Sequence, residues 1–168
     1  MEFTKVSSFI TYYETVRDIT NKVISVIPED KMNWSYYPGK FSIADLLRHI
    51  AAIERNLFAE VIQGKPSRYA GCGSELADSY VEIVNYFQEM HEQSMRIFSS
   101  LTDADLGRKI TTLNGREVSI SNFLRALVIH ETHHRGALII YLNLLGTSTP
   151  PVLGLTEEQV VQLSKSTL

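Results

Sequence analysis

The sequence predicts an all-α fold, an antiparallel four-helix bundle that forms a single domain over residues 1–168. Two observations predict it. Apolar residues recur at three- and four-residue steps in four long segments, a spacing typical of amphipathic helices. Glycine and proline fall between these segments, and strand-like alternation is absent except near one Asn-Gly pair. Four such helices bury their apolar stripes most simply against one another.

The first helix is expected at residues 4–26. Its apolar stripe consists of Val6, Phe9, Ile10, Tyr13, Val16, Ile19, Val23 and Val26. Pro28 ends the helix, because proline lacks the backbone N–H that a helix interior needs. The following loop contains Trp34, the one tryptophan of the chain. We expect Trp34 to pack at an end of the bundle, where this loop folds back over the first two helices.

The second helix is expected at residues 43–63. Ser42 can cap its first turn, and Asp45, three residues further on, partly imitates a capping box. Gly64 and Pro66 follow the last apolar residue and end the helix.

The third and fourth helices are expected at residues 75–101 and 119–145. The connection between them contains an Asn-Gly pair, which favours a short turn or hairpin. Gly146 ends the fourth helix, and a short helix is expected at residues 156–165. The lengths of the connections do not decide the order in which the four helices pack.

The composition excludes several classes of protein. Apolar residues make up 44% of the 168 residues and charged residues 21%, as in soluble globular chains. A formal net charge of −3 argues against nucleic acid as a partner, since nucleic acid favours a basic face. No apolar run reaches the ~18 residues of a membrane span, and the N-terminal segment does not resemble a secretory signal. With one cysteine, Cys72, an internal disulfide is impossible, so a reducing cytoplasm is the expected location.

Three of the five histidines lie in residues 130–136, which read HETHHRG. Three interpretations are open: metal ligands, a pH-sensitive patch, or a coincidence on a solvated helix face. At about 100° per residue, His134 falls inside the apolar stripe of its helix and His130 falls at the margin. His133 falls on the face that should be solvated. His130 and His134 are four residues apart and can direct their rings to one point.

His49 is the third candidate ligand, at the margin of the apolar stripe of the second helix. If the two margins face each other, three neutral imidazoles surround one point, which is a metal site with open positions for water or substrate. The competing interpretation is that the pair on the fourth helix arises by chance and binds nothing. His91, on the third helix, has no comparable partner and is expected to be exposed.

Two glutamates, Glu54 and Glu131, face inward on their helices. A buried carboxylate needs a partner. Each is therefore a weak candidate for a group that orients a ligand imidazole, and a salt bridge is an equally open interpretation. His133, Arg48 and Arg135 are expected to be solvated or salt-bridged rather than to take part in chemistry.

These features resemble the DinB/YfiT-like family of metal-dependent four-helix-bundle enzymes. The resemblance covers nearly the whole chain, and it consists of the loop MNWSYYPGKFS, the segment SIADLLRHIAAIE and the motif HETHHRGAL. HxxxHRG is the most specific part. The resemblance implies a divalent metal held by His49, His130 and His134. The glutamine that usually follows HRG in the family is Ala137 here, which removes a polar group near the site.

The resemblance implies a metal-dependent enzyme, in which Zn²⁺ or Ni²⁺ activates water or the sulfur of a low-molecular-weight thiol. The expected activity is that of a thiol-dependent S-transferase or a hydrolase. The rival expectation is a non-catalytic metal-binding or stress-related interaction bundle. Because imidazoles must be neutral to bind, metal should be lost below about pH 6. A homodimer is also expected, through a second apolar patch that involves the third helix.

Overall fold

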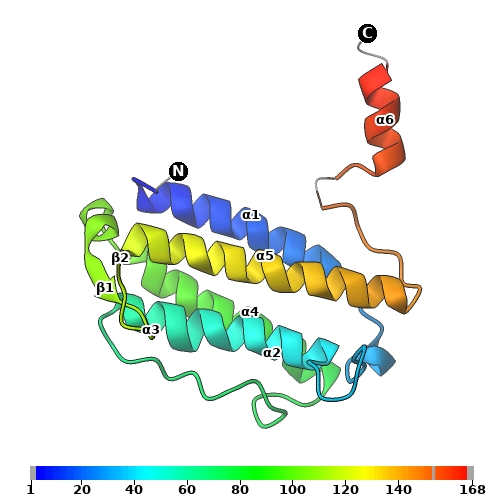
Figure 1. Cartoon of the computed structure of the whole chain (residues 1–168), viewed down its shortest axis with the longest axis horizontal. Coiled ribbons are helices and arrows are strands. Elements are labelled where there is room, and N and C mark those ends of the chain that lie inside the picture. Colours follow the sequence, from blue (N-terminus) through cyan, green and yellow to red (C-terminus); the bar gives the residue numbers. More distant parts are fainter. Residues whose placement is uncertain (1–2, 153, 166–168) are drawn as a thin grey trace.

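The computed structural model describes residues 3–152 and 154–165, and most of them form helices (Figure 1). Four helical rods make up a bundle. They are α1 (Val6–Ile24), α2 with its continuation α3 (Ile43–Ile53 and Ala59–Ile62), α4 (Tyr80–Ser99) and α5 (Ile120–Leu144). The predicted all-α four-helix bundle is confirmed.

The second rod, which contains His49, begins with a capping box and is interrupted by a π-helical turn. Ser42 and Asp45 form a full capping box: the Ser42 hydroxyl accepts from the Asp45 N–H at 3.1 Å, and the Asp45 carboxylate accepts from the Ser42 N–H at 2.9 Å. Between α2 and α3 the residues Glu54–Phe58 form a π-helical turn. Such turns widen a helix locally and occur frequently at functional sites.

The third rod begins later than the sequence predicts, at Tyr80 rather than near residue 75. Ser79 and Glu82 form a capping box, with the Ser79 hydroxyl accepting from the Glu82 N–H at 3.2 Å and Glu82 accepting from the Ser79 N–H at 3.0 Å. This cap stops the helix from extending further back. Residues 63–79 are instead a long connection outside the helices.

Short elements complete the described chain. The Asn-Gly pair lies in a hairpin of β1 (Lys109–Thr111) and β2 (Glu117–Ser119), which are antiparallel with Ile110 opposite Val118. Two 3₁₀ turns, Glu29–Lys31 and Asp103–Gly107, lie at the bundle ends. The predicted short helix is α6 (Glu157–Lys165), which lies apart from the four rods and has no buried residue (Figure 1).

The rods α1 and α5 run in one direction, and the second rod and α4 run in the opposite direction (Figure 1). The first residues of α1 and α5 lie at the same end of the bundle as the last residues of α3 and α4. Two long-range hydrogen bonds link this end: the Val6 N–H donates to Asp103 at 2.8 Å, and Arg108 donates to the Ile62 carbonyl at 2.8 Å. Because α2 and α4 are parallel neighbours, residues 63–79 must return along the length of the bundle.

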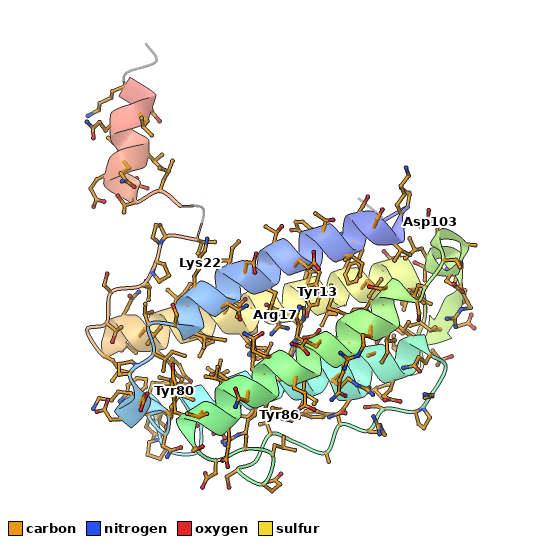
Figure 2. The ribbon with its side chains drawn as sticks, turned by 180° about the vertical axis from the view of Figure 1, so that it is seen from behind. Tyr13, Arg17, Lys22, Tyr80, Tyr86 and Asp103 are labelled. Atoms are coloured by element: carbon orange, nitrogen blue, oxygen red, sulfur yellow. The ribbon has the colours of Figure 1, made fainter. Side chains whose placement is uncertain are left out.

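The apolar core is divided into two clusters along the bundle. One includes Phe9, Phe98 and Leu124, and the other includes Leu47 and Leu138. Polar side chains of all four rods lie between the two clusters, and Figure 2 shows Arg17 on the side of α1 that faces α4.

One end of the second cluster is closed by the loop before α2. Trp34 is partly buried there and meets the ring of Tyr141 edge-on, with 5.3 Å between ring centroids. The described helices include none that is long and apolar enough to cross a membrane.

Candidate metal centre

Three histidines from two neighbouring rods converge near the middle of the bundle. His49 lies on α2, and His130 and His134 lie one turn apart on α5. One nitrogen from each of the three rings lies within 4.8 Å of the other two, and the Nε2 atoms of His49 and His130 are 3.1 Å apart. Nitrogens that share one zinc ion at 2.0–2.1 Å lie about 3–4 Å apart. We call these residues the three-histidine cluster.

The cluster is neutral near pH 7. Burial, followed by repulsion from the neighbouring imidazoles, lowers the pKa of His130 to about 3 and that of His134 to about 4. Burial also lowers the pKa of His49. A histidine must be deprotonated to bind a metal, so all three rings have a lone pair available at neutral pH.

Two nitrogens of the cluster lack a protein partner. The Nδ1 atoms of His130 and His134 are buried and have no hydrogen bond. Buried polar atoms without a partner are rare, and each one calls for an explanation such as a bound ion or water. In His130 the nitrogen that faces His49 is Nε2, so the unpartnered Nδ1 is on the other side of the ring and is not the atom that would bind a shared ion. The donor set fits a metal ion because three neutral imidazoles converge.

The walls around the cluster are aromatic. The ring of Phe41 lies 5.2 Å from that of His49, the ring of Tyr69 lies 5.7 Å from it, and the ring of Phe58 lies 6.4 Å from that of His130. Among the described residues, no carboxylate joins the three histidines in a set placed to share one ion. A cation at this point would keep its full charge, because its three protein ligands are neutral.

His133 lies outside this set, as the helical wheel predicts. It is exposed, although its ring is 4.9 Å from that of His134. Ala137, where the resembling family has glutamine, is a partly buried apolar residue against the second core cluster.

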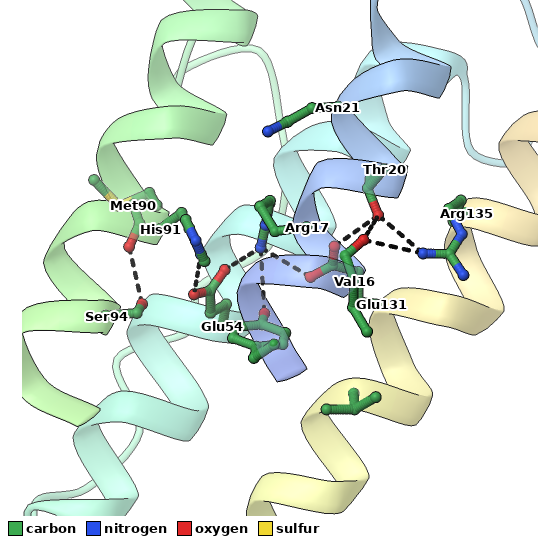
Figure 3. A network of polar contacts seen from close by, with 12 residues as sticks. Val16, Arg17, Thr20, Asn21, Glu54, Met90, His91, Ser94, Glu131 and Arg135 are labelled. Atoms are coloured by element: carbon green, nitrogen blue, oxygen red, sulfur yellow. Dashed lines mark hydrogen bonds and ion pairs between the residues drawn. The ribbon is translucent and has the colours of Figure 1, made fainter. Parts of the chain in front are cut away.

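Glu54 and Glu131 are fully buried, and both contact Arg17 (Figure 3). Arg17 forms ion pairs with Glu54 and, at 2.9 Å, with Glu131. The described hydrogen bonds and ion pairs of both carboxylates lead to Arg17, His91 and Thr20, and none leads to the three-histidine cluster. The contacts thus follow the salt-bridge interpretation that the sequence left open. We call these five residues the Arg17 network.

Arg17 itself was not singled out by the sequence. Burial lowers its pKa, but the charges of Glu131 and Glu54 outweigh burial and raise it well above the ordinary value for arginine. Its guanidinium also lies 4.1 Å from the ring centre of Phe87. The available signal was its position four residues after Tyr13, within the stripe of α1, together with two inward carboxylates that needed a cation.

The expectation that His91 is exposed and unpartnered is wrong. Its side chain is only 12% exposed, and its Nδ1 lies 2.9 Å from a Glu54 oxygen. The sequence offered no partner because Glu54 belongs to a different rod, and only the packing of α2 and its π turn against α4 brings the two together.

The two arginines near the histidines are buried rather than solvated. Arg135 donates to the Val16 carbonyl at 3.1 Å and to the Thr20 hydroxyl at 3.4 Å. Arg48 forms an ion pair with Asp45 at 2.7 Å and donates to backbone carbonyls.

Cys72 does not have the environment of a nucleophile. Burial and, after it, the charge of Asp45 raise the pKa of its thiol. A reactive cysteine needs the opposite shift.

Comparisons with known proteins agree with this architecture. The family model described as the DinB superfamily matches residues 12–138. The uncharacterized protein YjoA of Bacillus subtilis (strain 168) is 27% identical over 150 residues, covering 86% of this chain and 94% of YjoA. The crystal structure of YjoA superposes with a TM-score of 0.68 at 25% identity and covers 86% of this chain and 96% of that one.

Two further solved structures share the fold at lower identity. YfiT from Bacillus subtilis, described as a probable metal-dependent hydrolase with an unusual four-helix bundle topology, has a TM-score of 0.66 at 19% identity, covering 85% of this chain and 89% of YfiT. A mycothiol-dependent maleylpyruvate isomerase has a TM-score of 0.60 at 17% identity and covers 79% of this chain and 60% of the isomerase. Both likenesses concern the fold.

Proposed function

This chain belongs to the DinB superfamily, and from that premise we propose that it is a metal-dependent enzyme whose divalent cation is held by the three-histidine cluster. One observation carries the proposal: three neutral imidazoles from two rods converge, with one nitrogen of each ring within 4.8 Å of the other two. A fold does not by itself assign a reaction, so the proposal depends on this donor set.

Imidazole nitrogen suits both zinc and nickel, and we propose one of these two ions. A cation bound here supplies Lewis acidity, which brings the pKa of a coordinated water or thiol toward neutrality. The protein's part is to hold the three rings neutral and convergent. The aromatic rings of Phe41 and Tyr69 lie beside His49.

Two reactions suit such a centre. Hydrolysis is the first, in line with the description of YfiT. Transfer of a low-molecular-weight thiol is the second. The mycothiol-dependent isomerase that shares the fold supports this second reaction.

The rival function is a metal-binding bundle without turnover, such as a stress-related interaction protein. It predicts stoichiometric metal but no catalysis with any substrate, so metal content alone does not separate the two.

The test begins with protein purified without an affinity tag, because a histidine tag would itself carry metal. Elemental analysis and anomalous scattering should find about one zinc or nickel ion per chain, bound between α2 and α5. Metal-loaded protein is then screened with ester and amide substrates, and separately with thiols and electrophilic carbon compounds. Failure to take up metal after reconstitution would reject the enzyme and its rival together.

We also propose that two copies associate through the outer face of α5. Ile129, Ile140 and Leu144 are 64%, 59% and 64% exposed there. Gly136 lies between them, and a Cβ added at Gly136 would meet nothing within 4 Å. Glycine within a helix costs about 1 kcal/mol relative to alanine, and this chain's own packing does not require it. A second α5 crossing at Gly136 would explain both features, with the same patch on both subunits.

This surface differs from the one expected from the sequence, which involved the third helix. In the described part of α4, Val81 is the one large apolar side chain that is exposed. Light scattering should report a mass near twice 19.0 kDa for the native chain. Ile140→Glu should shift it to the mass of one chain, whereas Val81→Glu should not. Equal masses for the native chain and Ile140→Glu would reject the surface.

The composition supports a cytoplasmic location. The sequence has one cysteine, Cys72, which is free in the structure. A chain without disulfides suits a reducing compartment.

A further inference from the structure

The long connection between α3 and α4 is tied to the rod that contains His49. Arg48, which is 4% exposed, donates from Nε to the Cys72 carbonyl at 2.9 Å and from Nη1 to the Ala77 carbonyl at 2.7 Å. Nearer α3, the Arg68 N–H donates to the Asn56 carbonyl at 2.7 Å. These bonds hold residues 63–79 along the bundle, where Figure 1 shows the connection running beside α2.

This connection brings one side chain to the three-histidine cluster. The hydroxyl of Tyr69 lies 2.8 Å from Nδ1 of His49, and the two rings meet edge-on. His49 is the one member of the cluster whose Nδ1 has a recorded partner, since the buried Nδ1 atoms of His130 and His134 have none. In a neutral imidazole, the nitrogen that donates a hydrogen bond is protonated and the other has the lone pair.

The phenol is suited to accept this hydrogen bond. The ordinary pKa of tyrosine is about 10, so the Tyr69 hydroxyl is protonated at neutral pH. A neutral phenol has lone pairs to accept from His49 and one proton to donate elsewhere. Cys72 is a neighbour of Tyr69 on the same connection.

We propose that Tyr69 is a positioning residue for the metal centre, because its hydroxyl accepts from Nδ1–H of His49 and so keeps the Nε2 lone pair of His49 directed at His130. This role rests on the proposed function, since it concerns the same cation. Ligand histidines in metal sites usually donate their second ring N–H in this way, commonly to a carboxylate, a carbonyl or water. Here a tyrosine from a separate segment takes that place.

The test is Tyr69→Phe, which removes the hydroxyl and keeps the ring. In metal-free protein labelled with ¹⁵N at histidine, two-bond correlations to the ring protons report which nitrogen is protonated. His49 should be the Nδ1–H tautomer in the native chain and a mixture of tautomers in Tyr69→Phe. In competition with a chromophoric chelator, the variant should bind Zn²⁺ about 10–100-fold more weakly.

Tyr86→Phe is the matched control. Tyr86 is also half-buried, and its side chain lies beside that of Asn56, which is not a member of the cluster. Tyr86→Phe should leave the His49 tautomer and the Zn²⁺ affinity unchanged. Thermal unfolding of both variants separates a loss of stability from a loss of affinity. If Tyr69→Phe binds Zn²⁺ as tightly as the native chain, or if native His49 is the Nε2–H tautomer, Tyr69 is not a positioning residue.

Different results would reject the proposed metal-dependent enzyme and the proposed role of Tyr69. If the native chain binds no Zn²⁺ or Ni²⁺, the proposed enzyme is rejected, but the tautomer of His49 in the metal-free protein still decides whether Tyr69 orients that ring. If the native chain binds metal and the variant is unaffected, the metal centre stands and only the role of Tyr69 is rejected.

Discussion

The three-histidine cluster and the Arg17 network share two rods, the second rod and α5, and the network also includes residues of α1 and α4. In the network, all four oxygens of Glu54 and Glu131 lie within hydrogen-bond or ion-pair distance of a protein group. In the cluster, the rings are neutral and two buried nitrogens have no partner. In the network the charge of Arg17 is balanced by two carboxylates, although its Nε and Nη1 atoms have no hydrogen-bond partner. The cluster contains no charge to balance, and its neutral rings converge on one point.

Neighbours in sequence belong to the two different sites. His130 is a member of the cluster, and Glu131, one residue later, is fully buried against Arg17. A step of about 100° on α5 separates them. The comparison therefore teaches that one helix can serve a structural site and a candidate functional site at the same level, and that charge, rather than burial, distinguishes them.

The largest expected effect is on the cluster. His134→Ala removes one of three ligands and should abolish stoichiometric metal binding, whereas His133→Ala should leave it intact because His133 lies outside the set. Elemental analysis of both variants, prepared without a tag, measures this. Stoichiometric metal in both variants would mean that the three-histidine cluster is not a metal site, and the contrast between the two sites would lose its functional meaning.

The next effect is on the network. Arg17→Met leaves two carboxylates buried without their shared cation, which should lower the free energy of unfolding by about 3–5 kcal/mol. Chemical denaturation measures it. Arg125→Met, at an exposed position of α5, should change stability by less than about 0.5 kcal/mol. Equal effects of the two substitutions would show that Arg17 does not hold the network together.

The dependence on pH should follow the cluster. The pKa values of His130 and His134 in the folded protein, about 3 and about 4, are below the ordinary value of 6.5. Between these pH values the unfolded chain therefore binds more protons than the folded chain. The free energy of unfolding should fall as pH decreases from about 6.5 toward 4. Denaturation of metal-free protein across this range measures the slope, and His130→Leu should flatten it. An unchanged slope in His130→Leu would assign the acid sensitivity to other groups.

The same lowered pKa values revise the expectation of metal loss below about pH 6. Protons compete with a cation only when the rings accept them, and these rings accept protons well below the ordinary histidine value. A bound ion should therefore persist below pH 6.

The smallest expected effect tests whether the two sites are independent. Glu54→Gln should leave the Zn²⁺ affinity unchanged, because the contacts of Glu54 lead to Arg17 and His91. Chelator competition measures it, with Tyr69→Phe as the variant expected to weaken binding. An affinity loss in Glu54→Gln comparable to that of Tyr69→Phe would restore Glu54 as a group that orients a ligand ring.

Much of the candidate site could be predicted because it depends on local geometry. The positions of His130 and His134 relative to the apolar stripe follow from the 3.6-residue period, and His49 was recognised by the same rule. The inward direction of Glu54 and Glu131 was predicted in the same way. Their partner Arg17 was not, because a helical wheel shows which side chains face inward and does not show what they meet.

By itself, the sequence determined the four helices, the Ser42 cap, the Asn-Gly hairpin and the faces on which the histidines lie, since each depends on residues within a few positions of one another. Only the tertiary structure decided that α2 and α4 are parallel, that His91 is paired with Glu54, and that Tyr69 reaches His49. These contacts join separate elements, 37 residues apart for Glu54 and His91 and 20 for His49 and Tyr69. Local periodicity carries no information about such pairs, because the packing of the rods decides which margins face each other.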